Sequence, residues 1–157
     1  MRDEYGYPSV FKQFVKNVYG SNLQHRIIPF PQTSQNAARF FRDKGLRPDL
    51  IYVDASHEYD DVLADLHAWY PLLSEHGMIF GDDYCKHWHG VMDAVDRFSR
   101  YANMSVRHER FENGPGEAPS DYWWYEKKAG CNRHAVCADH PNSSHCYDDD
   151  CEDCFGS

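Results

Sequence analysis

The stretch from Pro48 to Tyr84 constrains the fold most, because two short apolar runs in it are each followed by acidic residues. The runs, at 50–53 and 78–80, are too short for helices and rich in β-branched and aromatic side chains, so they predict buried strands of a parallel sheet. Between them, apolar residues recur with the spacing of a single helical face, at Val62, Leu66, Trp69 and Leu73. The segment is therefore predicted to be one strand–helix–strand unit.

Polar residues follow both predicted strands at the point where each strand ends. Asp54 and His57 come after the first strand, and Asp82 and Asp83 come after the second. In sheets of this kind, ligands bind beyond the carboxyl ends of the strands. These four residues are therefore the candidate functional site.

The motifs DASH at 54–57 and GDDY at 81–84, with the helical pattern between them, resemble the second half of a class I S-adenosylmethionine-dependent methyltransferase. The resemblance is to small-molecule O-methyltransferases that use a divalent metal, including macrolide-sugar methyltransferases and the cephalosporin-hydroxylase-like group. It runs from about Tyr5 to Lys128. The glycine-rich loop of the family, D/E-x-G-x-G, has no counterpart before the first strand.

The resemblance implies an α/β fold, a truncated Rossmann-like methyltransferase fold that lacks the glycine-loop half. The sheet is then expected to be mainly parallel, with helices on both faces and an antiparallel strand pair at the C-terminal end. Two strands over 105–111 and 122–128, joined by the turn-rich segment ENGPGEAPS, fit that final pair. A helix over 88–101 is predicted to precede them, since apolar residues line one of its faces.

The resemblance also implies S-adenosylmethionine as cofactor, a small-molecule hydroxyl as methyl acceptor, and a divalent ion, with Mg²⁺ the first candidate. Asp54, Asp82 and Asp83 match the metal-binding positions, and His57 matches the catalytic base. Carboxylate oxygens suit a hard divalent ion, and an imidazole can accept a proton near pH 7. The alternatives stay open: acidic residues there can simply cap helices or favour solvated loops, and His57 can be a surface or capping histidine.

Upstream of this unit, the apolar spacing predicts a helix over 11–18 and the next apolar run predicts a strand over 26–30. Thr33 or Ser34 can then cap a second helix. By resemblance, Thr33, Ser34 and Asp54 contribute to the cofactor site. An ordinary helix cap is the alternative for the two hydroxyl residues.

The composition changes after residue 128, which divides the chain into a partial methyltransferase-like domain over 1–128 and a cysteine-rich acidic tail over 129–157. Five of the six cysteines lie in that tail. Disulfides, a structural zinc ion and disorder are all compatible with the spacing of these cysteines.

Charge and hydropathy exclude some classes of partner. A net charge of -9 without a clustered basic face argues against nucleic acid. No apolar run reaches the length of a membrane span, and the first twenty residues lack a signal-peptide core, so a cytoplasmic protein is expected. Secretion is the alternative that the cysteine-rich tail keeps open.

The family strands without counterparts would leave one edge of the sheet unpaired, and unpaired edges invite strand pairing with another chain. We therefore expect a homodimer or a partner chain at this edge. For function, a methyltransferase is the first hypothesis. The alternatives are a non-catalytic remnant or binding module of the same fold, and an incomplete chain that needs a partner to bind the cofactor.

Overall fold

The computed structural model describes residues 9–115 and 119–127 of the chain. Two compact units are present, residues 1–32 and residues 33–157. The predicted cysteine-rich tail lies outside the described residues. Within the described ranges, no helix is both long enough and apolar enough to cross a membrane.

The first unit contains α1 (Val10–Gly20), which confirms the predicted helix. The strand predicted over 26–30 is wrong, because these residues form a turn and an irregular segment. The backbone N–H groups of Arg26 and Ile27 both donate to the carbonyl of Leu23 and so close a turn. Pro29 and Pro31 have no N–H to donate to a strand partner, which explains why the apolar run stays unpaired.

The second unit contains the remaining helices and all the strands of the described residues. In chain order they are α2 (Ser34–Asp43), β1 (Leu50–Val53), α3 (Tyr59–Trp69), the short 3-10 helix η1 (Tyr70–Leu72), β2 (Met78–Gly81), α4 (His89–Tyr101), β3 (Arg107–Phe111) and β4 (Ser120–Glu126). The predicted strand–helix–strand unit is confirmed in β1, α3 and β2.

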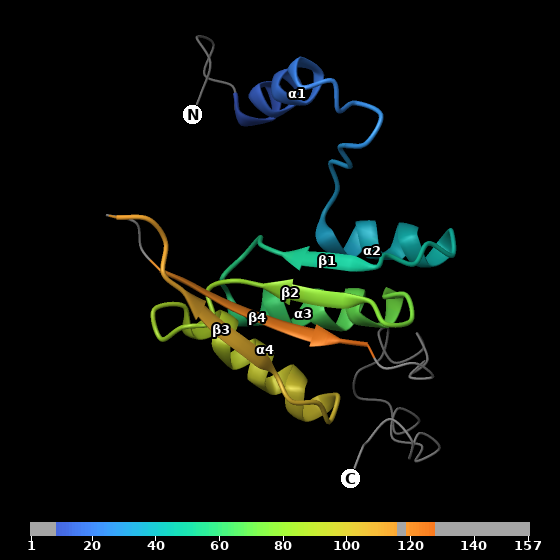
Figure 1. Cartoon of the computed structure of the whole chain (residues 1–157). Helices are drawn as coiled ribbons and strands as arrows, with labels where there is room; N and C mark the ends of the chain where they lie inside the picture. The colour runs from blue at the N-terminus through green and yellow to red at the C-terminus, as the bar shows by residue number, and fades with distance from the viewer. Residues whose placement is uncertain (1–8, 116–118, 128–157) are drawn as a thin grey trace. The chain divides into compact units, whose positions relative to one another are not determined.

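The strands form one four-stranded sheet in the order β1-β2-β4-β3 (Figure 1). β1 and β2 are parallel, whereas β4 is antiparallel to both of its neighbours. The α/β fold and the C-terminal antiparallel pair are therefore confirmed. The expectation of a mainly parallel sheet is corrected to a mixed sheet, because the segment at 26–30 adds no parallel strand within the described residues.

Side chains that alternate along the strands divide the sheet into a packed face and an open face. Figure 1 shows α3 and α4 behind the sheet, and they bury Ile79, Trp123 and Tyr125. α2 packs on α3, since the ring of Phe41 meets that of Trp69 at 5.2 Å. The helices of the second unit thus cover one face, which corrects the expectation of helices on both faces for this part of the chain.

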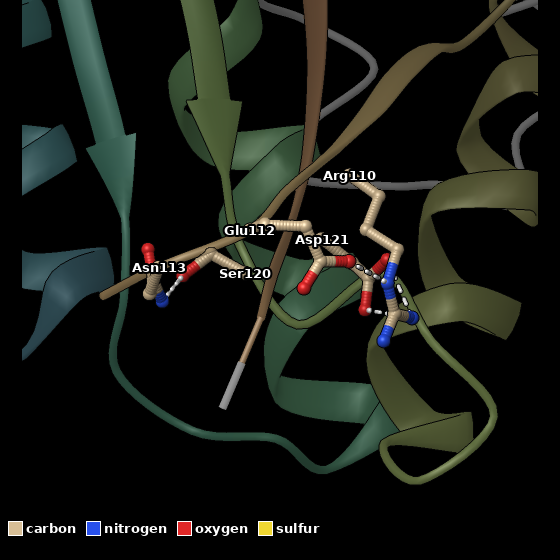
Figure 2. A network of polar contacts seen from close by, with 5 residues as sticks. All are labelled: Arg110, Glu112, Asn113, Ser120 and Asp121. Carbon is tan, nitrogen blue, oxygen red and sulfur yellow. Dashed lines mark hydrogen bonds and ion pairs between the residues drawn. The ribbon is translucent and has the colours of Figure 1, made fainter. Parts of the chain in front are cut away.

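Polar contacts fix the end of β3 against the start of β4 (Figure 2). Arg110 pairs with Asp121 at 3.4 Å and with Glu112 at 3.6 Å. Asn113 Nδ2 donates to Ser120 Oγ at 3.1 Å. These contacts hold the first residues of β4 in place, and those residues in turn support the segment that follows β2.

Candidate functional site

The candidate site lies at the ends of the two parallel strands. Val53 and Gly81 are partners in the register of β1 and β2, so Asp54 and Asp82 leave the sheet at the same edge. The hydroxyl of Tyr52 interacts with both carboxylates. The predicted convergence of the two strand ends is therefore found, and a tyrosine joins it.

Negative charge is concentrated at this edge. Burial raises the pKa of Asp82, and the nearby charges of Asp83 and Asp54 raise it further, while the Tyr52 hydroxyl acts in the opposite direction. Burial also raises the pKa of Tyr52, as do the two carboxylates of Asp82 and Asp54. This edge of the sheet is consequently suited to positively charged ligands and unfavourable for a further anion.

β4 anchors the segment that carries the second pair of acids. Trp123 Nε1 donates to the carbonyl of Asp82 at 3.1 Å, and the N–H of Tyr84 donates to the carbonyl of Asp121 at 2.9 Å. The Tyr84 hydroxyl donates to Asp96 of α4 at 2.6 Å. Burial, with this carboxylate, raises the pKa of Tyr84 to about 12. The backbone on both sides of Asp83 is therefore tied to the sheet.

His57 and Asp83 form the closest contact between predicted site residues. His57 Nε2 lies 3.0 Å from Asp83 Oδ2, and both side chains are about one-third exposed. Asp83 has a φ of 62°, a left-handed conformation that is uncommon for residues other than glycine and that occurs preferentially at functional sites. This left-handed residue is the one whose carboxylate contacts the imidazole.

The contact with Asp83 decides which nitrogen of His57 can accept a proton. A neutral imidazole has one N–H donor and one acceptor nitrogen, and the nitrogen beside a carboxylate carries the hydrogen. Nε2 is therefore the donor to Asp83. Nδ1, which has no hydrogen-bond partner in the part of the chain that the structure describes, keeps its lone pair. His57 is arranged as a base with one free nitrogen.

The predicted metal site stays a prediction. No group of three or more histidine, cysteine, aspartate or glutamate residues within the described ranges is placed so that it could hold an ion. In addition to burial, the charges of Asp83 and Asp54 raise the pKa of Asp82, which also interacts with Tyr52, and Asp83 pairs with His57. The carboxylate chemistry of the three residues fits a hard cation.

Thr33 and Ser34 have contacts away from this edge. Thr33 Oγ1 accepts the N–H of Asn36 at 3.3 Å, so it caps α2. Ser34 Oγ accepts Trp69 Nε1 at 2.8 Å, at the last residue of α3, while His57 precedes the first turn of that helix. The structure does not bring these two hydroxyls together with Asp54.

Two participants were missed by sequence reasoning. Tyr52 precedes Asp54 by two residues, and the two-residue repeat of a strand was a usable signal for it. Trp88 packs on His57 with 4.1 Å between ring centroids, and no local pattern in the sequence indicates that contact.

Comparison with known proteins agrees with this fold. A family model described as a methyltransferase domain matches residues 5–84. An uncharacterized protein of Acanthamoeba polyphaga mimivirus is 30% identical over 91 residues, which cover 52% of this chain and 37% of that protein. The chain thus spans little more than a third of the length of that relative.

Two solved structures share the fold. The O-methyltransferase from Bacillus cereus in complex with SAH has a TM-score of 0.58 and 14% identity, over 82% of this chain and 60% of that chain. A protein described as an rRNA methylase from Clostridium thermocellum has a TM-score of 0.51 and 15% identity, over 78% of this chain and 69% of that chain.

Proposed function

This chain belongs to the class I S-adenosylmethionine-dependent methyltransferases, and we propose that it transfers a methyl group to a hydroxyl of a small molecule. The observation that carries the proposal is the contact between His57 and Asp83 at 3.0 Å, beside the acidic strand ends. The Bacillus cereus neighbour is named as an O-methyltransferase, and this name supports oxygen as the acceptor atom.

The residues of the site have separate tasks in this proposal. When bound, S-adenosylmethionine supplies a methyl group on a positively charged sulfur. The acceptor hydroxyl needs a base, and its proton passes to Nδ1 of His57. The carboxylate of Asp83 on the opposite nitrogen stabilises the resulting imidazolium and fixes the orientation of the ring, as an aspartate does in other catalytic histidine pairs.

The acidic strand ends are our candidates for the cofactor side. The negative field of Asp54 and Asp82 is complementary to a cationic sulfonium, and the interactions among these carboxylates and Tyr52 hold them at one edge. Asp54 therefore stays in the proposed cofactor site. Thr33 and Ser34 are assigned to helix capping and helix packing instead.

The divalent ion implied by the family resemblance is kept as a separate proposal, with Mg²⁺ as the probe. Carboxylate oxygens are its usual ligands. Since three ligands do not converge within the described residues, we derive no catalytic step from the ion. The base proposed above, His57 with Asp83, can be tested independently of it.

A second candidate function is a binding module of the same fold, or a chain that completes its cofactor site with a partner. The observation that favours it is the edge position of β1. β1 lies at the edge of the sheet and pairs only with β2 among the described strands. A homodimer or a partner chain that adds a strand to β1 is the assembly we propose for this case.

Calorimetric titration with S-adenosylmethionine, followed by a methyl-transfer assay against small phenols, sugars and hydroxy acids, tests the proposal. For an active protein, His57→Ala should lower the transfer rate by about 100-fold or more and leave cofactor affinity unchanged. Asp83→Asn should lower the transfer rate less than His57→Ala, because the imidazole of His57 remains and only the charge of its partner is lost. Full activity of the His57→Ala protein would show that another group is the base.

Without the glycine-rich loop, we expect the isolated chain to bind S-adenosylmethionine weakly or not at all. Binding at micromolar or lower concentration would contradict this expectation and favour a self-sufficient enzyme. No transfer to any acceptor, together with binding only in the presence of a second chain, would favour the binding-module or partner-dependent alternative.

A further inference from the structure

We infer that the first turn of α4, through Trp88 and Gly90, is a positioning element for His57. The inference rests on the proposed role of His57 as the base. It concerns residues that contact the imidazole or its backbone and that contribute no group to proton transfer.

Gly90 allows α4 to approach the His57 segment closely. A Cβ atom at position 90 would lie 2.2 Å from the carbonyl oxygen of His57 and 2.8 Å from the nitrogen of Tyr59. Both are backbone atoms, so no side-chain rotation can relieve such a contact. A glycine is therefore required for the helix to rest directly on residues 57–59.

Trp88 contacts the ring of the same histidine. Its indole lies 4.1 Å from the imidazole, centroid to centroid, at an angle of 43°. The carbonyl of Trp88 accepts the N–H groups of Val91 at 3.1 Å and Met92 at 3.2 Å. Because Trp88 is the N-cap residue of α4, these bonds tie its backbone to the helix.

α4 itself is fixed to the core of the second unit. Ala94 and Val95 have no exposed surface, and Phe98 is 2% exposed. These residues pack in one cluster with α3 and the sheet. The position of His57 is therefore set by three contacts: the carboxylate of Asp83, the ring of Trp88 and the backbone at Gly90. The last two transmit the position of α4 to the imidazole.

A displacement of the base should act on the chemical step. In Gly90→Ala, residues 57–59, α4 or both must move apart until the added Cβ no longer overlaps the backbone of His57 and Tyr59. A misplacement of about 1 Å can cost about 100-fold in rate, so we expect a fall in kcat of this order. Cofactor affinity should change much less than kcat, because Asp54 directly follows β1 and Asp82 directly follows β2, and the overlap at Gly90 involves neither strand.

Gly20→Ala is the matched control. Gly20 is also helical, and a Cβ atom there would meet nothing within 4 Å. Both changes add one methyl group to a helical glycine, so the control isolates the close approach at position 90. The Gly20→Ala protein should match the wild-type protein in kcat and in its NMR spectra.

Long-range ¹H–¹⁵N NMR spectra of the imidazoles provide a readout that does not need activity. The His57 signals, assigned with His57→Ala, report the distribution of the proton between Nδ1 and Nε2. Gly90→Ala should shift these signals away from the Nε2–H form, and Gly20→Ala should not. Unchanged His57 signals in the Gly90→Ala protein would overturn the inference, whatever its activity.

A second pair of variants decides the matter if Gly90→Ala does not fold. Trp88→Leu removes the ring contact without a backbone overlap, and Trp88→Phe keeps a ring. The leucine variant should lose kcat and shift the His57 signals, and the phenylalanine variant should recover most of both. Equal behaviour of the two variants would overturn the role of the ring. Absence of methyl transfer by the wild-type protein would defeat the proposed function, and the NMR comparison would still decide what positions His57.

Discussion

Gly81 gives the sharpest test of how the sheet supports the candidate site. It is the last residue of β2, directly before Asp82, and it is buried. A Cβ atom there would lie 2.6 Å from Cζ2 of Trp123 and 2.7 Å from the carbonyl oxygen of Val53. Neither neighbour can yield easily, because the indole is 1% exposed and the carbonyl belongs to the adjacent strand.

Two opposing effects determine the size of the Gly81→Ala change. Overpacking of a dense core costs about 1–3 kcal/mol. Replacing glycine reduces the conformational entropy of the unfolded chain and returns about 0.4–1 kcal/mol. We therefore expect Gly81→Ala to lower the free energy of unfolding by about 1.3 kcal/mol, the difference between the midpoints of those two ranges.

Urea denaturation followed by circular dichroism measures this loss as a lower midpoint with an unchanged slope. Trp123→Phe removes the part of the indole that would overlap, so the cost of Gly81→Ala should be smaller in the Trp123→Phe background. The coupling should reach at least about 0.5 kcal/mol. Gly20→Ala serves as the control in open space. The same cost for Gly81→Ala in both backgrounds, or no cost at all, would refute this reasoning.

Three further predictions concern the acidic residues that follow β1 and β2 and the position of β1 as an edge strand of the sheet. The pKa of Asp82 is raised in the folded state, chiefly by burial. Above a pH of about 4, the folded protein therefore binds more protons than the unfolded one. Its stability falls as the pH rises from there through the folded-state pKa of Asp82. The change in the free energy of unfolding caused by Asp82→Asn should therefore be more favourable at pH 7 than at pH 3. Thermal melts that show the same change at both pH values would contradict this. If the proposed ion binds among Asp54, Asp82 and Asp83, Mg²⁺ should raise the Tm. The stabilisation should reach about 2.7 kcal/mol at one hundred times the Kd and should disappear in the Asp82→Asn, Asp83→Asn double variant. An unchanged Tm would contradict the metal site. Light scattering during gel filtration should detect a dimer through β1, and a monomer at every concentration would count against that assembly.

Local patterns in the sequence were sufficient for much of the fold. The apolar spacing of α3 and the short runs of β1 and β2 are properties of neighbouring residues, so the strand–helix–strand unit was predicted correctly. The segment at 26–30 has the composition of a strand, but Pro29 and Pro31 deprive it of donors, and no partner forms among the described residues. The mixed character of the sheet could not be derived from the strands alone, because strand order depends on tertiary contacts.

The site was predictable only to the level of the sheet edge. Parallel strands that end in register bring Asp54 and Asp82 together. The sequence indicates both the two strands and the acidic residue that follows each of them. The pairing of His57 with Asp83 depends on a backbone angle of 62° at Asp83, for which an aspartate gives no reliable sequence signal. The contacts of Trp88 and Gly90 with the His57 segment depend on where α4 begins in space, and residues thirty positions apart carry no periodicity that would indicate it.

The place of β4 within the sheet has a consequence for the order in which this chain can fold. Among the described strands, β4 comes last along the chain, yet it lies between β2 and β3, so β3 lacks its partner β4 until residues 120–126 are synthesised. Contacts between segments far apart in sequence form slowly, and the Asp82 carbonyl receives its bond from Trp123 only at that final stage. A nascent chain that stops before Ser120 therefore lacks the middle of its sheet and exposes the apolar surface of α4, which makes it a substrate for chaperones and proteases.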